Sequence, residues 1–140
     1  MPPAPQPVAH YTPVREAGGL LFVAGQTPHI QGQLEHAGLV GRDLSLEDAR
    51  LMARRAALNV VAALDNHLGG LDRIESLVSL TGFVACGGDF TDHPLVINGA
   101  SDVFLEVFGS DGVHARASVG VSSLPGGAPV EVSVIAALRA

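Results

Sequence analysis

Residues 113–121, near the end of the sequence, place one arginine on a segment that alternates as a strand does. Apolar residues occupy every second position, and the positions between them hold His114, Arg116, Ser118 and Gly120. Arg116 has a planar fork of N–H donors that fits a carboxylate through two parallel hydrogen bonds. The pattern leaves two interpretations open, capture of an anionic small molecule or the surface salt bridge that exposed strand arginines more often form.

Three further side chains could take part in such chemistry. Glu131 interrupts the apolar run 130–135, where a carboxylate could act as a general base or position a water, although alternation alone favours an outward-facing residue. Tyr11 could aim its hydroxyl at a ligand or simply pack at the edge of the domain. Asn98 could bind a ligand, and a local cap interaction is the competing interpretation.

Other reaction classes lack the required spacing. Ser118 has no histidine–acid pair to activate it, since His114 is only two residues away, so a serine hydrolase is not expected. The histidines show no metal-ligand spacing, and the glycine pairs form neither a dinucleotide nor a phosphate-binding motif. We expect no metal and no cofactor, and we expect Cys86 to be a small buried residue.

The composition is that of one domain with spare apolar surface. The chain has 140 residues, 47% of them hydrophobic and 16% charged, which suits a homo-oligomer that buries the excess. The net charge is −6 and there is no lysine, so nucleic-acid binding is not expected. A single cysteine, the absence of a signal-peptide pattern and the lack of a long apolar run predict a cytoplasmic protein without a membrane span.

The elements that would position these residues can be predicted from periodicity. Residues 1–9 are expected to form an extended or disordered lead-in to a single domain spanning 1–140. A hairpin with strands near 12–16 and 20–24 is followed by a loop over 28–44. Ser45 and Gly69 bracket a long amphipathic helix whose predicted apolar face runs from Leu46 to His67.

The second half continues with a strand over 74–86, predicted to be central and covered on both faces. A helix follows, beginning near Asp92 and ending at Gly109, with Val107 on its predicted buried face. The Asn98-Gly99 pair is costly inside a helix and marks a possible functional spot. Strands over 113–121 and 130–135 complete an α+β domain of order β-β-α-β-α-β-β.

Several segments, taken in order, resemble the RidA/YjgF family of small imine deaminases, also labelled the L-PSP endoribonuclease family. The resemblance runs from Tyr11 to Leu138. Its segments are Leu21-Phe22-Val23-Ala24-Gly25-Gln26, Leu58-Asn59-Val60, Thr81-Gly82-Phe83-Val84, Asn98, His114-Ala115-Arg116-Ala117-Ser118-Val119, Leu124-Pro125 and Val130-Glu131-Val132. Two positions depart from the family pattern, because Ala24 replaces a common serine and Ser118 replaces a common cysteine.

The resemblance implies a chorismate-mutase-like fold, a mixed sheet with two helices on one face, assembled as a homotrimer with pockets between subunits. It implies hydrolysis of reactive 2-imino acids to 2-keto acids and ammonia without a cofactor. Arg116 would bind the substrate carboxylate and Glu131 would order the attacking water. The other substrate-binding residues implied are Tyr11, Gly25, Asn98 and Ser118.

Two alternatives remain at this point. The hydroxyl missing at Ala24 is compatible with a non-catalytic trimer that binds small carboxylates or acts like a chaperone. The older family label names a ribonuclease, against which stand the net charge of −6, the lack of lysine and the absence of a cluster of stacking aromatics.

Overall fold

The helices and strands follow one another in the predicted order β-β-α-β-α-β-β. The computed structural model describes residues 2–6 and 10–140. Its elements are β1 (Val14–Ala17), β2 (Leu20–Gln26), α1 (Leu46–Leu68), β3 (Ile74–Ala85), α2 (His93–Phe108), β4 (Ala115–Val121) and β5 (Val130–Leu138). Of the predicted lead-in, residues 2–6 have no regular secondary structure, whereas residues 1 and 7–9 lie outside the described residues.

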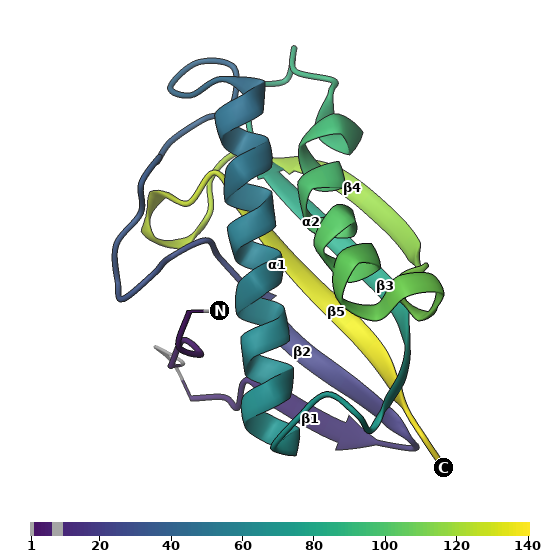
Figure 1. Cartoon of the computed structure of the whole chain (residues 1–140). Coiled ribbons are helices and arrows are strands. Elements are labelled where there is room, and N and C mark those ends of the chain that lie inside the picture. Colours follow the sequence, from purple (N-terminus) through teal and green to yellow (C-terminus); the bar gives the residue numbers. More distant parts are fainter. Residues whose placement is uncertain (1, 7–9) are drawn as a thin grey trace.

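The five strands form one mixed sheet in the order β1-β2-β5-β3-β4. β3 and β4 are parallel, and the other neighbouring pairs are antiparallel. A parallel pair needs a long crossover, and α2 supplies it between β3 and β4. Both helices lie across the same face of the sheet (Figure 1), which confirms the predicted mixed sheet with two helices on one face.

Helix α1 begins and ends where the capping residues predict. The Ser45 hydroxyl accepts a hydrogen bond from the Asp48 backbone N–H at 3.1 Å, and Gly69 closes the helix in a left-handed conformation. The buried face is rich in alanine, which lets α1 lie close to its neighbours. His67 was expected on this face, but it is exposed and lies 3.8 Å from the Glu16 carboxylate. The helical period turns His67 out of the apolar stripe, whose last fully buried side chain is Leu64.

Helix α2 departs from prediction in two details. Asp92 precedes the helix, but its side chain makes no capping hydrogen bond. Val107 is 41% exposed rather than buried, and Ile97 is buried in addition to the predicted apolar residues. Helical rotation places Val107 beyond the edge of the stripe that faces the sheet. Gly99 has a packing reason, since a Cβ there would collide with the backbone carbonyl of Arg50 in α1.

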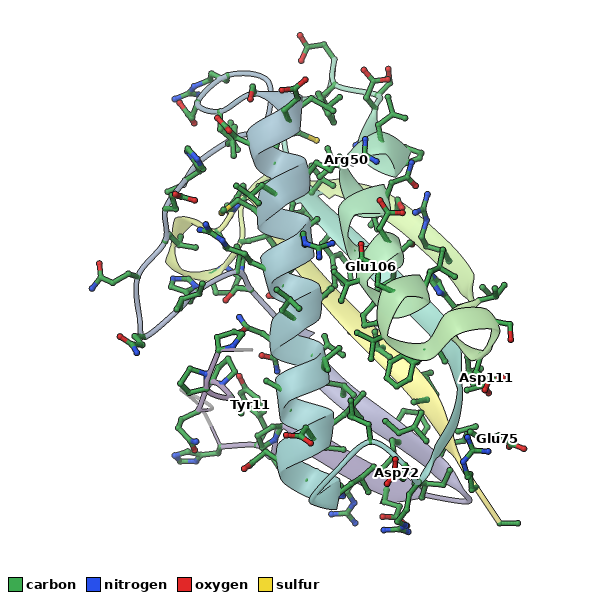
Figure 2. All side chains as sticks on the ribbon, viewed as in Figure 1. Tyr11, Arg50, Asp72, Glu75, Glu106 and Asp111 are labelled. Carbon is green, nitrogen blue, oxygen red and sulfur yellow. The ribbon has the colours of Figure 1, made fainter. Side chains whose placement is uncertain are left out.

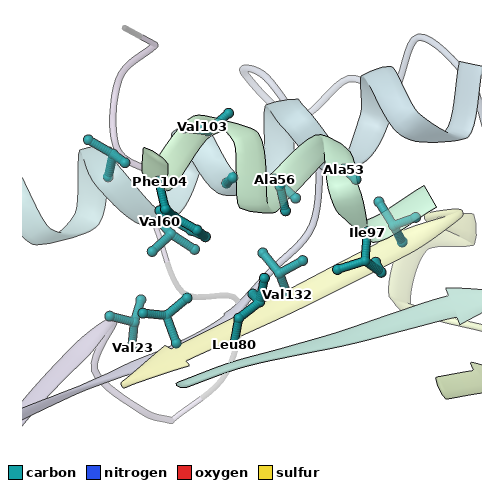
Figure 3. Packing of buried hydrophobic residues seen from close by; sticks show 14 of the residues in the cluster. Val23, Ala53, Ala56, Val60, Leu80, Ile97, Val103, Phe104 and Val132 are labelled. Atoms are coloured by element: carbon teal, nitrogen blue, oxygen red, sulfur yellow. The ribbon is translucent and has the colours of Figure 1, made fainter. Parts of the chain in front are cut away.

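The core fills the layer between the helices and the sheet. Figure 3 shows Val60 and Phe104 from the helices above Leu80 and Val132 from the central strands. All four side chains are fully buried. Within the described residues, neither helix has the length and apolar character needed to cross a membrane.

Among the described residues, no helix lies on the opposite face of the sheet, so β3 is not covered on both faces as predicted. Its central position, between β5 and β4, is confirmed. Along β3, buried residues that face the helices alternate with partly exposed ones. Large apolar side chains remain in contact with solvent on this open face, namely Phe22 at 42%, Val78 at 40% and Val119 at 43% exposure. The apolar run of β3 therefore predicted burial on both faces, but a single chain buries only the face beneath the helices.

Candidate functional site

The predicted site residues fall into two separate groups. Tyr11, Gly25 and Glu131 line one cavity of about 730 Å³. Arg116 and Asn98 meet elsewhere, between β4 and α2. Figure 2 shows Tyr11 beside the N-terminal segment, on the side of α1 away from α2, and Figure 1 places β4 at the far edge of the sheet.

The cavity lies where the end of β2, the loop after it and the start of β5 converge. The N-terminal segment and the turn before β5 complete its wall. Tyr11 is 51% exposed, so its ring borders the opening rather than the core. The lining residues are Pro3, Ala4, Pro5, Gln6, Tyr11, Pro13, Gly25, Gln26, Thr27, His29, Gln31, Gly32, Pro125, Gly126 and Glu131.

Glu131 brings a partly buried carboxyl group to this cavity. The pairing of β2 with β5 is irregular between Val23 and Gln26, and Gly25 lies in that irregular stretch. A Cβ at Gly25 would collide with the Glu131 carboxylate, so the close approach requires glycine. Burial raises the pKa of Glu131 above its ordinary value, because a less hydrated site disfavours the charged form. Such a carboxyl group is better suited to proton transfer near neutral pH than an ordinary surface glutamate.

Sequence reasoning missed three polar residues of the same cavity. The His29 Nδ1 and Thr27 Oγ1 atoms lie 2.8 Å apart, and Gln26 is buried with its side-chain amide donating to the Ala24 carbonyl at 3.2 Å. Thr27 and His29 lie in the loop after β2, where no periodicity marks side-chain direction, and Gln26 ends β2 at the irregular part of its pairing with β5.

One residue of α1 could have indicated from the sequence how this loop is anchored. Asn59 is fully buried on the apolar face of the helix, and a buried amide needs partners. Its amide nitrogen donates to the backbone carbonyls of Thr27 and His29, both at 2.9 Å. Asn59 therefore holds the cavity loop against the helix layer.

Arg116 is held by neutral acceptors rather than by a carboxylate. Nη1 donates to Asn98 Oδ1 at 2.8 Å and to Ser101 Oγ at 3.1 Å, and Nη2 donates to the Pro94 carbonyl at 3.4 Å. Among the described residues, no acidic side chain pairs with it, so the surface salt bridge is not formed. A guanidinium has five N–H donors. The bonds within the chain leave Nε–H and one Nη2–H for an outside acceptor.

Ser118 follows Arg116 on the same face of β4. Its hydroxyl oxygen is buried and has no hydrogen-bond partner among the described residues. His114 does not activate it, because the His114 ring bonds to Ser101 and to the Gly112 carbonyl instead. The arrangement matches the expectation that Ser118 is not a triad nucleophile.

Arg116 and Glu131 point to opposite faces of the sheet. Directly paired residues on neighbouring strands share a face. Arg116 pairs with Leu80, which is buried beneath the helices, whereas Glu131 pairs with Phe83 and stands between the buried Val130 and Val132. One chain therefore does not bring these two side chains together.

Cys86 also has a polar neighbour. Its Sγ lies 3.4 Å from His93 Nε2, and burial raises the pKa of the thiol, so the neutral thiol is favoured. Among the described residues, no three histidine, cysteine, aspartate or glutamate side chains gather as metal ligands would.

Comparison with known proteins shows the family of this chain. Residues 1–138 match the family model described as "YjgF/chorismate_mutase-like, putative endoribonuclease". The chain belongs to the YjgF/RidA family. Protein TCP17 of Trypanosoma cruzi is 40% identical over 140 residues, which cover 99% of this chain and 88% of that protein.

Solved structures of YjgF/RidA-like proteins agree in fold. The protein Atu1372 from Agrobacterium tumefaciens superimposes with a TM-score of 0.90 at 42% identity, covering 94% of this chain and 83% of that one. YyfA from Yersinia pestis, named as a member of the conserved Rid protein family, has a TM-score of 0.67 at 26% identity, covering 96% and 92%. Both likenesses extend over nearly the whole YjgF/RidA domain.

Proposed function

We propose that this protein hydrolyses small 2-imino acids to 2-keto acids and ammonia, in pockets formed where one copy of the chain meets another. The observation that carries the proposal is the hydrogen bonding of the Arg116 side chain. Its guanidinium has no acidic partner among the described residues and keeps adjacent donors unused. Family membership supports an activity of the Rid type at this position.

The unused donors suit a carboxylate group. Nε–H and Nη2–H lie on neighbouring atoms of one planar group, so they can bind both oxygens of a substrate carboxylate. Asn98 and Ser101 hold the other terminal nitrogen, Nη1, while the Pro94 carbonyl takes the second hydrogen of Nη2. The substrate would then lie with its imine carbon directed away from β4.

Glu131 would act on the water. Its raised pKa suits a group that accepts a proton from water as the water oxygen attacks the imine carbon. Glu131 passes this proton to the imine nitrogen, so the C=N bond becomes a C–N single bond and the carbon carries one OH and one NH2 group. Glu131 then takes the hydroxyl proton and delivers it to the nitrogen, the C–N bond breaks with its electron pair on nitrogen, and ammonia leaves as the C=O bond forms. One imine and one water give one keto acid and one ammonia.

A pocket between copies follows from the placement of the two groups. Arg116 and Glu131 leave the sheet on opposite faces, so a joint site needs each from a different chain. The open face offers a surface for such contact, since Phe22, Val78 and Val119 are exposed there. A closed homotrimer would bury these side chains and repeat the site at each interface.

The test is turnover of a 2-imino acid released in situ by an amino-acid oxidase, with semicarbazide trapping the imine that remains. We expect Arg116→Ala to lower kcat/KM at least about 100-fold, because a charge-assisted bidentate contact is lost. Arg42→Ala is the matched control, since Arg42 is exposed and paired only with the neighbouring Asp43. Unchanged imine hydrolysis by Arg116→Ala would reject the proposal.

A carboxylate-binding protein without turnover is the competing function. Ala24 supports it, because this position next to Gly25 presents a methyl group where many family members have a hydroxyl. Binding of a 2-keto acid by the wild type, with no imine hydrolysis over the buffer rate for several substrates, would favour this alternative.

A further inference from the structure

A directed chain of hydrogen bonds runs from the backbone after α2 to Arg116. His114 Nδ1 lies 2.6 Å from the Gly112 carbonyl oxygen, His114 Nε2 lies 2.9 Å from Ser101 Oγ, and Arg116 Nη1 lies 3.1 Å from that same oxygen. Three side chains and one carbonyl thus form an unbroken series.

The chemistry of its two ends sets the direction of every bond. A carbonyl oxygen only accepts, so His114 donates from Nδ1 and the neutral ring keeps a lone pair on Nε2. The Ser101 hydroxyl must then donate to Nε2. Its oxygen lone pairs remain, and one of them accepts from Arg116, whose guanidinium only donates. Each group performs the role that its neighbour requires.

The carbonyl end of the series is fixed to rigid structure. Gly112 packs so closely against the backbone carbonyl of Phe104 that a Cβ would collide with it. The Phe104 ring is buried and meets the His114 ring edge-on, with centroids 5.9 Å apart and ring planes at 88°. The imidazole is therefore held by a hydrogen bond and by a packed aromatic ring.

At the other end, the series completes the constraint on the guanidinium. Asn98 takes one hydrogen of Nη1 and Ser101 takes the other. With both engaged, Nη1 is held in place, and the Nε–H and one Nη2–H of this exposed side chain have no acceptor among the described residues. Without Ser101, the side chain would lose one of these two anchors and part of its orientation.

We propose that Ser101 and His114 are positioning residues for Arg116, which present its Nε–Nη2 edge to the substrate carboxylate. This role rests on the proposed function, because it concerns the same guanidinium. Neither side chain touches substrate in this account; Ser101 acts through Arg116, and His114 acts through Ser101. Preorganising a binding group in this way improves affinity by reducing the ordering cost on binding.

The first test concerns the imidazole alone. Nitrogen-15 NMR of the neutral His114 ring should find the proton on Nδ1. A proton on Nε2 would reverse the bond to Ser101 and overturn the proposal. This measurement needs no substrate, so it remains decisive whatever reaction the protein carries out.

The second test measures how rigidly the Arg116 side chain is held. Its Nε–H NMR signal, assigned by its loss in Arg116→Lys, should be sharp in the wild type. It should broaden in Ser101→Ala and in His114→Phe but not in the control Ser110→Ala. An unchanged signal in Ser101→Ala would overturn the proposal.

The third test measures the Kd for 2-oxobutanoate as a keto-acid probe. We expect Ser101→Ala to weaken binding about 5- to 20-fold, Ser101→Thr to restore it, and the double variant with His114→Phe to be no worse than either single one. Wild-type affinity in Ser101→Ala contradicts the proposal. If the wild type itself binds no keto acid, the proposed function fails, and the Nε–H signal decides the positioning role by itself.

Discussion

Arg116 and Glu131 belong to strands that share one neighbour, β3, yet their side chains leave the sheet on opposite faces. Arg116 reaches α2 at one edge of the sheet, and Glu131 lines a cavity bounded by the end of β2. Under the proposed function, each chain would supply Arg116 to a site with one neighbouring copy and Glu131 to a site with another.

Replacing Glu131 with glutamine should alter stability in a pH-dependent way. The folded-state pKa of Glu131 is raised, so the folded chain binds this proton more tightly than the unfolded chain does. The wild type therefore loses stability as pH rises from the unfolded pKa through the folded pKa. Glu131→Gln avoids that loss, so its free energy of unfolding should exceed that of the wild type at pH 7.5 and match it near pH 4. Urea denaturation at both pH values measures the difference.

Glu131→Gln should lower activity even though it raises stability at pH 7.5. Imine hydrolysis should fall strongly, because a glutamine does not accept the proton from water. In the wild type, kcat/KM should rise with pH through the raised pKa of Glu131. A pH profile without this rise, or a Glu131→Gln variant that is less stable at pH 7.5, would contradict the assigned role.

Gly25→Ala tests the close approach beside Glu131. The added Cβ would meet the carboxylate, and this flexible side chain must move aside. We expect kcat/KM to fall at least about tenfold while the melting temperature changes little, since the displaced group is a side-chain end rather than backbone. Gly88→Ala is the control, because a Cβ there meets nothing within 4 Å. Equal activity in the two variants would show that the position of the carboxylate is unimportant.

Asn59→Ala should destabilise the fold through the cavity loop. The Thr27 and His29 carbonyls would lose their shared donor in a buried setting, at a cost of about 2–4 kcal/mol in the free energy of unfolding. Asn66→Ala, on the same helix but exposed, should stay within about 0.5 kcal/mol of the wild type. Chemical denaturation compares them, and similar values for both would argue that Asn59 does not anchor the loop.

Local signals predicted the elements of this fold well. Alternation and helix caps are decided by neighbours in sequence: β4 covers Ala115–Val121 of the strand predicted over 113–121, and the caps Ser45 and Gly69 are confirmed. The predicted burial of His67 and Val107 was wrong, because helical periodicity gives the direction of the apolar stripe but not its width.

The site was harder to predict because it depends on distant residues. The resemblance pointed to Arg116 and Asn98 separately, and in the structure the two side chains form a hydrogen bond. Alternation did not indicate that Arg116 and Glu131 face apart, since strand order and register decide that. The sequence did not single out Ser101, because its role depends on contacts with His114 and Arg116, which only the packing of β4 against α2 brings near it.

The central claim is that Arg116 of one chain works with Glu131 of another, and subunit complementation tests it most directly. Arg116→Ala and Glu131→Gln chains, each inactive alone, are co-expressed with different tags, and oligomers carrying both tags are purified. In a trimer that carries both chains, one interface of the three places an intact Arg116 opposite an intact Glu131, so imine hydrolysis should return to about a third of the wild-type rate per trimer. Mixed oligomers as inactive as either parent would contradict the account.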